Sequence, residues 1–341
     1  MTIYHKTSQG WLKLFCNTID FGRYPLDMPC TSFYDLLNSA VIDLIRTIPR
    51  SAQLPVMMFF LYYAGLKPGD KLDFFHNYYS PIWSIIPHIL KKQENTLFSE
   101  ILINHAAGTH AMAMLLHSLD DHLNDGDLSS NHLTLLIRSQ AWKLLHDHLE
   151  PLTSAVTGGR ELADDCLDSY YGSIISQVCP ENLEEYLDLF RHQMATAFIV
   201  PLLLAHRYDN SALGNAVHIA LESFGIAWRI LDDIKDLEID FLAGSVSAVS
   251  LSLPEEGKRL WREIKDPEHF KIKNQSKVTV ENERRFQILE SIIQDCGIIT
   301  ALLKRILKEI DNATNNAEKA GLLDLAAELR LIASPLWERL K

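Results

Sequence analysis

Two short acidic segments contain the side chains whose types and spacing are best suited to chemistry. Each segment follows an apolar run and contains a pair of adjacent aspartates. The aspartates of the first segment (LDDHLND) are Asp120, Asp121 and Asp125. The aspartates of the second segment (LDDIKDLEID) are Asp232, Asp233, Asp236 and Asp240. Residues four apart lie on one face of a helix, so each segment predicts a row of carboxylates at a helix end.

Such a row of carboxylates needs positive partners. Two unit charges about 4 Å apart repel by about 4 kcal/mol at an effective dielectric near 20, and the partial negative charge of a helix C-terminus adds to the cost. Mg²⁺ takes one or two carboxylates and completes its shell with water and phosphate oxygens. One segment alone would be interpreted as a solvated acidic surface. Two matching segments predict a Mg²⁺ site that binds a diphosphate and stabilises it as a leaving group.

The rest of the chain predicts the helices that position these segments. Its 341 residues are 47% hydrophobic, which is enough for one large domain with a sizeable core. Three long proline-free stretches (88–150, 202–253 and 268–334) carry apolar residues three and four apart, as helices do. Strand-like alternation is confined to 245–252 (SVSAVSLS), which suits a loop equally well. We therefore predict an all-α protein of about ten to twelve helices.

The overall composition excludes several classes of protein. A formal net charge of −12 disfavours nucleic-acid binding, and no apolar run reaches the roughly 20 residues of a transmembrane helix. The five cysteines never form a C-x-x-C pair, which is typical of reduced thiols. Since the N-terminus lacks the features of a signal peptide, we expect a cytoplasmic protein without a transmembrane segment.

The two acidic segments resemble the aspartate-rich motifs of the isoprenoid synthase superfamily, specifically its trans-prenyltransferase (polyprenyl diphosphate synthase) branch. Residues 224–236 (FGIAWRILDDIKD) are similar to the second motif along their whole length, and residues 120–125 stand where the first motif belongs. The resemblance covers about residues 36–245. It implies an all-α bundle over residues 36–341, preceded by an N-terminal arm of residues 1–35. It also implies Mg²⁺ as cofactor, an allylic prenyl diphosphate as substrate and a homodimer.

The resemblance carries roles over to individual residues. The catalytic residues would be Asp120, Asp121, Asp232 and Asp233. The metal ligands would be Asp120, Asp121, Asp125, Asp232, Asp233 and Asp236. The diphosphate would be bound by Arg50, Gln193, Arg229 and Lys235. Aromatic side chains on the neighbouring predicted helices could line the cavity and stabilise a carbocation; they are Phe59, Phe60, Tyr62, Tyr63, Phe198, Phe224 and Trp228.

Departures from the family pattern affect the reaction that we expect. The basic element before the first motif (PRSAQLP) keeps Arg50 but lacks the family's glycines, lysine and second arginine. Ser129 and Ser130 stand where the family carries an Arg-Arg pair. Most of the isopentenyl diphosphate site is therefore missing. We expect transfer of the prenyl group to another acceptor.

Three alternatives stay open. A class I terpene synthase (cyclase) would act on the same type of substrate, and a non-catalytic subunit of a heteromeric prenyl synthase would explain the lost basic residues. A metal-dependent phosphohydrolase is a more distant alternative, because the sequence has no H-E-x-x-H motif. Its metal ligands would be His117, Asp121, His122, His146 and Asp147.

Overall fold

The structure is a computed structural model that describes residues 10–92, 99–124, 126, 128–176, 179–207, 211–263 and 280–340. Within these ranges all regular structure is helical and no strand occurs. The predicted all-α fold class is therefore confirmed.

The helices follow one another with short connections. The first half of the chain forms α1 (Trp11–Thr18), α2 (Met28–Thr47), α3 (Arg50–Tyr63), the 3-10 helix η1 (Phe74–Asn77), α4 (Pro81–Lys92), α5 (Glu100–Asn124), α6 (His132–Ser154) and α7 (Gly159–Ile175). The second half forms α8 (Leu183–Gln193), α9 (Ala195–His206), α10 (Ser211–Lys235), α11 (Leu237–Ala243), α12 (Ala248–Ser252), α13 (Glu255–Arg262), α14 (Val280–Asp295), α15 (Ile298–Lys319) and α16 (Leu323–Leu340).

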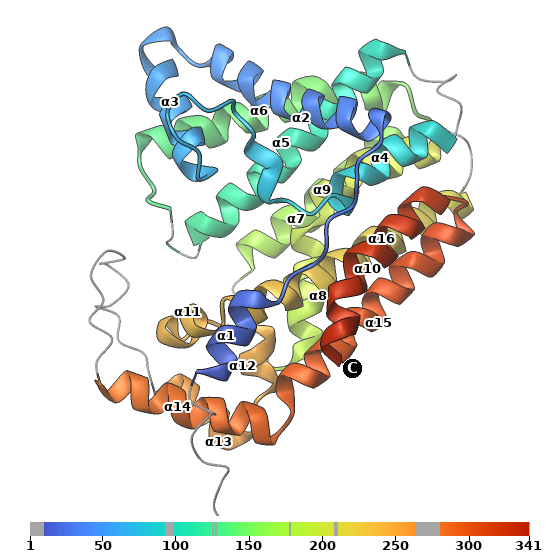
Figure 1. The fold of residues 1–341 in the computed structure, drawn as a ribbon. Helices are drawn as coiled ribbons and strands as arrows, with labels where there is room; N and C mark the ends of the chain where they lie inside the picture. The colour runs from blue at the N-terminus through green and yellow to red at the C-terminus, as the bar shows by residue number, and fades with distance from the viewer. Residues whose placement is uncertain are drawn as a thin grey trace, which may run out of the picture.

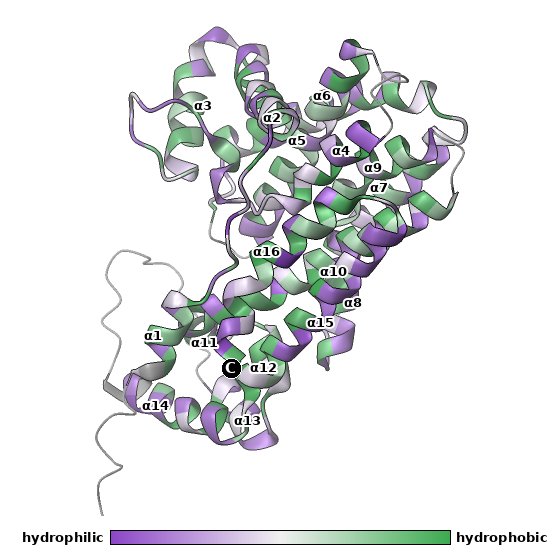
Figure 2. Cartoon of the chain, turned by 45° about the vertical axis from the view of Figure 1, so that its right-hand side comes forward, coloured by the Kyte–Doolittle hydropathy of each residue, from purple (hydrophilic) through white to green (hydrophobic). Residues whose placement is uncertain are grey.

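Helix α9 lies at the centre of the bundle. All its residues from Ala195 to Ala205 are buried, and it packs against α4, α5, α7 and α10. Helices α2, α3, α5 and α6 lie together at one end of the molecule, and α11–α14 lie at the other end (Figure 1). The long helices α10, α15 and α16 pack side by side. Colouring by hydropathy shows apolar faces along α9 and α10 inside the bundle (Figure 2).

The sixteen α-helices of the described ranges exceed the ten to twelve predicted. Two of the helix boundaries are single-residue breaks, at Met194 between α8 and α9 and at Asp236 between α10 and α11. Helices α8 and α9 meet at a bend of 60°. The alternating segment at 245–252 forms no strand. Its second part is the short helix α12, which starts at a capping box formed by the Ser247 and Ser250 side chains.

The predicted N-terminal arm contributes to the core. Leu12, Cys16, Ile19 and Phe21 are buried, and α2 runs across the predicted boundary at residue 35. The division into an arm and a helical domain stays a prediction.

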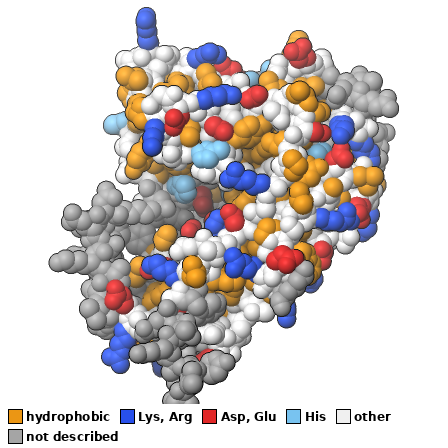
Figure 3. Space-filling model, in the orientation of Figure 1, with side chains coloured by type: hydrophobic (Ala, Val, Ile, Leu, Met, Phe, Trp, Pro, Cys, Tyr) orange, Lys and Arg blue, Asp and Glu red, His pale blue; other side chains and the backbone are white. Residues whose placement is uncertain are grey.

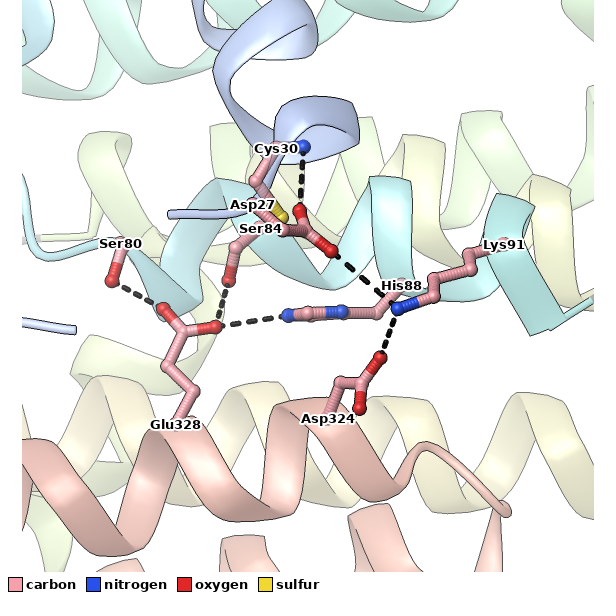
Figure 4. Close-up of polar contacts among 8 residues, drawn as sticks. All are labelled: Asp27, Cys30, Ser80, Ser84, His88, Lys91, Asp324 and Glu328. Atoms are coloured by element: carbon pink, nitrogen blue, oxygen red, sulfur yellow. Dashed lines mark hydrogen bonds and ion pairs between the residues drawn. The ribbon is translucent and has the colours of Figure 1, made fainter. Parts of the chain in front are cut away.

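A buried polar cluster joins the C-terminal helix α16 to α4 (Figure 4). The Glu328 carboxylate is fully buried and accepts hydrogen bonds from Ser80 and from Ser84 Oγ at 2.8 Å. His88 Nε2 lies 3.0 Å from Glu328 Oε2. Because an unpaired buried carboxylate would be costly, these contacts fix the position of α16 on α4.

A glycine allows the broken helix α8–α9 to pack closely on α10. A Cβ atom at Gly225 would lie 2.2 Å from Met194 Sδ, so a larger residue at this position would require the Met194 side chain to move. This contact lies two turns before the second acidic segment.

No single helix of the described ranges has the length and hydropathy needed to cross a membrane, whereas two bent helix pairs, α8 with α9 and α14 with α15, reach those values only when taken together.

Candidate active site

The C-terminal ends of α5 and α10 meet at a pocket with a volume of about 220 Å³. Side chains from α3, η1, α5, α8 and α10 form its wall. The lining residues are Tyr63, Ala64, Phe74, Asn77, Tyr78, His117, Ser118, Asp121, His122, Phe190, Trp228, Arg229 and Asp232. Two acidic segments that are distant in the sequence therefore contribute to one site.

One aspartate of each predicted pair lines the pocket: Asp121 at the end of α5 and Asp232 at the end of α10. Both side chains are partly buried. Burial raises the pKa of Asp232 to about 6, against the opposing charge of Arg229. The Asp232 carboxylate therefore lacks full electrostatic compensation in the protein alone.

Arg229 lies between the two acidic helix ends. Its Nε donates to the Tyr186 hydroxyl at 2.6 Å and lies 3.2 Å from Asp233 Oδ1. Its Nη1 lies 4.0 Å from Asp121 Oδ2, and the guanidinium stands 5.5 Å above the rings of both Tyr186 and Phe190. Burial alone would lower the pKa of Arg229, but Tyr186 and the surrounding carboxylates keep it well above its ordinary value. The pocket thus contains a permanent positive charge.

The second aspartate of the α10 segment, Asp233, is buried and fully hydrogen-bonded. Its Oδ1 accepts from the Tyr186 hydroxyl at 3.1 Å, and its Oδ2 accepts from the Ala248 backbone N–H at 2.6 Å. Burial raises the pKa of Asp233, while Arg229 and these hydrogen bonds oppose the rise. Asp233 therefore connects α10 to α8 and to the start of α12.

The first aspartate of the α5 segment, Asp120, is paired in a similar way. Arg138 on α6 contacts both carboxylate oxygens, with Nη2 3.0 Å from Oδ2. The Tyr170 hydroxyl on α7 donates to Oδ2 at 2.6 Å. Asp120 is 5% exposed and does not line the pocket.

A polar wall from α3, η1 and α5 closes the other side of the pocket. The Tyr63 hydroxyl lies 2.6 Å from His122 Nδ1, and Tyr78 forms a hydrogen bond with Ser118. Burial lowers the pKa of His117, which therefore carries no charge near neutral pH. Of the aromatic residues predicted for the cavity, Tyr63 and Trp228 line the pocket.

The remaining predicted residues lie elsewhere. Arg50 is exposed at the start of α3, and Lys235 Nζ lies 3.4 Å from both Asp20 Oδ1 and the Tyr79 hydroxyl. Gln193 reaches the pocket wall through its backbone, whose carbonyl oxygen lies 3.2 Å from His117 Nδ1. None of these three side chains lines the pocket.

The last two of the six predicted metal ligands are Asp236 and Asp125. Asp236 is exposed at the break between α10 and α11 and is not among the lining residues. Asp125 lies outside the described residues. The metal and diphosphate assignments from the sequence all stay predictions.

Sequence reasoning missed the partners of the buried aspartates, namely Arg138, Tyr170 and Tyr186. They come from α6, α7 and α8, and no spacing in the sequence connects them to the acidic segments. Only the general rule that buried carboxylates need donors could have pointed to such residues.

The carboxylates of the pocket are the groups that could hold a metal ion. No three His, Cys, Asp or Glu side chains in the described part of the chain lie close enough together to form a metal site. Asp121 and Asp232 nevertheless place two carboxylates in one pocket. A cation bound there would lower the pKa of Asp232, which burial has raised. The pocket therefore fits a hard cation that takes most of its ligands from water or phosphate.

Comparison with known proteins identifies the fold. No family model and no curated protein matches the sequence. Among solved structures, decaprenyl diphosphate synthase from Rhodobacter capsulatus matches with a TM-score of 0.60 at 15% identity, over 92% of this chain and 100% of that one. Geranylgeranyl pyrophosphate synthase from Corynebacterium glutamicum, complexed with isoprenyl diphosphate and magnesium, matches with a TM-score of 0.53 at 14% identity, over 90% and 99% of the two chains.

Geranylgeranyl pyrophosphate synthetase from Pyrococcus horikoshii matches with a TM-score of 0.58 at 12% identity, over 89% of this chain and 98% of that one. This chain therefore has the all-α fold of the trans-prenyltransferase branch of the isoprenoid synthase superfamily, and the resemblance inferred from its acidic segments is confirmed at the level of the fold.

Proposed function

We propose that this protein is a prenyltransferase-type enzyme that binds an allylic prenyl diphosphate between the ends of α5 and α10, ionises it and transfers the prenyl group to an acceptor. The observation that carries the proposal is the meeting of Asp121, Asp232 and Arg229 in one pocket. The fold supports it, because the solved structures compared above are prenyl diphosphate synthases.

In this proposal Asp121 and Asp232 would hold Mg²⁺, which supplies Lewis-acid stabilisation of the departing diphosphate. Arg229 binds the diphosphate directly, since its guanidinium is a permanent donor in a partly buried pocket. Because Arg229 already lies near the carboxylates, the binding of a diphosphate would give this cation a second anionic partner.

The aromatic wall contributes on the carbon side of the substrate. Phe74, Tyr78, Phe190 and Trp228 line the same pocket as the acidic side chains. Their ring faces stabilise positive charge on an allylic carbon through the quadrupole and exclude water that would quench it.

The nature of the acceptor follows from the charges. A second diphosphate would require further basic side chains, and Arg229 is the one arginine or lysine among the lining residues. Isopentenyl diphosphate is therefore a poor acceptor here, and an uncharged nucleophile or an internal double bond fits better. With a volume of about 220 Å³ the pocket accommodates the head of the substrate and only a short part of its chain.

The experiment is incubation of the full chain and Mg²⁺ with geranyl, farnesyl or geranylgeranyl diphosphate. Each substrate is given alone, with isopentenyl diphosphate, or with an uncharged nucleophile as acceptor, while released diphosphate is measured and product masses are recorded. Diphosphate release that needs an added acceptor supports the proposal. Release with a hydrocarbon product and no acceptor identifies a terpene synthase instead. Absence of release from all three substrates with every acceptor supplied contradicts both.

A non-catalytic subunit of a heteromeric synthase is a second candidate, favoured by one specific observation. Asp120 is already paired with Arg138, and Asp233 with Arg229, so only one aspartate of each Asp-Asp pair lines the pocket. This candidate predicts that the chain alone binds an allylic diphosphate without turning it over. Equilibrium binding of the unreacted substrate would separate it from the enzyme.

A further inference from the structure

One histidine of the pocket is held in a single tautomer. His117 lies on α5, and its Nδ1 stands 3.2 Å from the backbone carbonyl oxygen of Gln193. Because a carbonyl oxygen only accepts hydrogen bonds, Nδ1 must carry the ring proton and donate it. Burial lowers the pKa of His117, so the imidazole is uncharged and its lone pair lies on Nε2.

The break between α8 and α9 makes this carbonyl available. Helix α8 ends at Gln193, and the backbone N–H of Ala197 donates to the Met194 carbonyl at 2.9 Å. The Gln193 carbonyl therefore lacks the backbone donor that a continuous helix would supply four residues later. His117 donates to it instead, so the bend between two helices orients an imidazole on a third.

The unprotonated Nε2 of His117 belongs to the pocket. His117 stands one turn before Asp121 on α5, and both residues line the pocket with Arg229. In the part of the chain that the structure describes, the His117 side chain forms a hydrogen bond through Nδ1 and none through Nε2. On the face seen in Figure 3, histidine and acidic side chains lie next to each other between the two ends of the molecule. A bound molecule that donates a hydrogen bond would satisfy Nε2.

The other groups of the pocket that could take a proton are bound differently. Asp121 and Asp232 are the carboxylates that hold the cation in the proposed function. The Nδ1 of His122 lies 2.6 Å from the Tyr63 hydroxyl, which can donate or accept, so this contact does not determine the tautomer of His122. Of these groups, His117 is the one whose hydrogen bond determines where its free lone pair lies.

We propose that His117 is the general base of the transfer reaction and that the acceptor is an uncharged molecule with an O–H or N–H group. Its Nε2 accepts a hydrogen bond from this group and so holds the nucleophilic atom in the pocket. A carbon–carbon double bond has no such donor and would leave Nε2 unpaired. The inference deepens the proposed function and rests on it.

The transfer step moves one proton and two electron pairs. The lone pair of the acceptor oxygen or nitrogen forms the bond to the allylic carbon. The bond from that carbon to the diphosphate oxygen breaks, and its electron pair leaves with the diphosphate. The proton of the acceptor moves to Nε2 of His117, and water takes it from the imidazolium after the product has left.

The surroundings of His117 suit both protonation states. Burial has the largest effect and favours the neutral ring, as does the charge of Arg229. Asp121, the Gln193 carbonyl and Asp120 favour the imidazolium. His117 therefore begins each turnover uncharged, and the imidazolium that forms during the transfer has anionic neighbours.

The experiment compares His117→Asn and His117→Gln with the unaltered full chain. The amide nitrogen of asparagine is three bonds from Cα, as Nδ1 is, so it can still donate to the Gln193 carbonyl while nothing replaces Nε2. The amide of glutamine reaches the position of Nε2, where its oxygen can accept a hydrogen bond but cannot take a proton. The probes are farnesyl diphosphate and Mg²⁺ with phenol, benzyl alcohol or aniline as acceptor.

We expect the unaltered protein to form a farnesyl ether or amine with at least one of these acceptors. In His117→Asn its formation should fall about 10²-fold, while equilibrium binding of farnesyl diphosphate stays unchanged. In His117→Gln kcat should fall about as much, but KM for the acceptor should change little. The control His132→Asn alters an exposed histidine that does not line the pocket and should keep the full rate. Circular dichroism checks that every variant is folded.

Each contrary result has a distinct meaning. Full product formation in His117→Asn or an undiminished kcat in His117→Gln overturns the role of His117 as base. A larger loss in His122→Asn than in His117→Asn assigns the base to His122 and contradicts the proposal. If the unaltered protein releases diphosphate but its products contain none of the three probes, the proposed class of acceptor is wrong. If it releases no diphosphate from any allylic substrate, the proposed function itself fails, and the role of His117 fails with it.

Discussion

The two acidic helix ends share one arrangement and differ in one respect. In each, one aspartate is buried between an arginine and a tyrosine while its neighbour in the sequence lines the pocket. The buried groups are Asp120 with Arg138 and Tyr170 at the end of α5, and Asp233 with Arg229 and Tyr186 at the end of α10. Adjacent residues of a helix point in different directions, so an Asp-Asp pair supplies one structural and one pocket carboxylate.

The difference lies in the arginines. Arg138 comes from α6, contacts Asp120 and does not line the pocket. Arg229 lies on α10 itself, four residues before Asp233, and lines the pocket near Asp121. The first arginine therefore stabilises the fold, whereas the second both stabilises the fold and places a cation in the site.

The largest expected effect separates the pocket carboxylates from the buried ones. In Asp232→Asn we expect diphosphate release from an allylic diphosphate to fall at least about 10³-fold, because one of two metal-facing carboxylates is removed. The free energy of unfolding should not be reduced, since Asp232 has no structural partner comparable to those of Asp233. A diphosphate-release assay and urea unfolding measure the two quantities.

The matched control for this prediction is Asp147→Asn, which removes an exposed aspartate on α6 that does not line the pocket. It should retain activity. If Asp232→Asn released diphosphate as fast as the unaltered protein, the end of α10 would take no part in the reaction, and the proposed role of the pocket would be wrong.

The next effect concerns stability at the first helix end. In Arg138→Leu we expect the free energy of unfolding to fall by about 3 kcal/mol, because the Asp120 carboxylate stays buried without its cation. The double variant Asp120→Asn/Arg138→Leu should recover most of that loss, since no unpaired charge remains. Urea unfolding of the three proteins gives the values. A double variant as unstable as the single one would mean that packing, and not charge pairing, is the role of Arg138.

A smaller effect distinguishes the two arginines. In Arg229→Gln we expect the affinity for inorganic diphosphate without metal to fall about tenfold, because a charge-assisted donor is lost from the pocket. Arg138→Gln should leave that affinity unchanged, since Arg138 does not line the pocket. Isothermal titration of folded protein measures both. Equal losses in the two variants would contradict the distinction drawn between these arginines.

The comparison also indicates what the sequence could predict. Helical periodicity was sufficient for the fold class, because it is a local pattern. The presence of Asp121 and Asp232 in one pocket was expected from the resemblance of the two acidic segments to a pair of facing family motifs. The pairing of Asp120 and Asp233 with arginines was not predictable, because it depends on contacts with α6, α7, α8 and α12. The helix breaks at Met194 and Asp236 were not predicted either, because neither position carries glycine or proline.

The smallest effect tests whether the second helix end keeps an uncompensated charge. Burial raises the pKa of Asp232 from 3.8 to about 6, so between these values the folded protein binds a proton that the unfolded chain releases. Stability of the metal-free protein should therefore fall as pH rises from about 4 to about 6 and stay lower above that range.

Asp232→Asn removes this titration. Because the Asp232 side chain is only partly buried, we expect the variant to be more stable than the unaltered protein by about 1 kcal/mol at pH values above about 6, and equally stable near pH 4. Urea unfolding at the two pH values measures the difference. A stability difference that does not change with pH would mean that Arg229 already compensates the charge of Asp232 as well as that of Asp233. The end of α10 would then be as fully paired as the end of α5, and it would have less need of a bound cation.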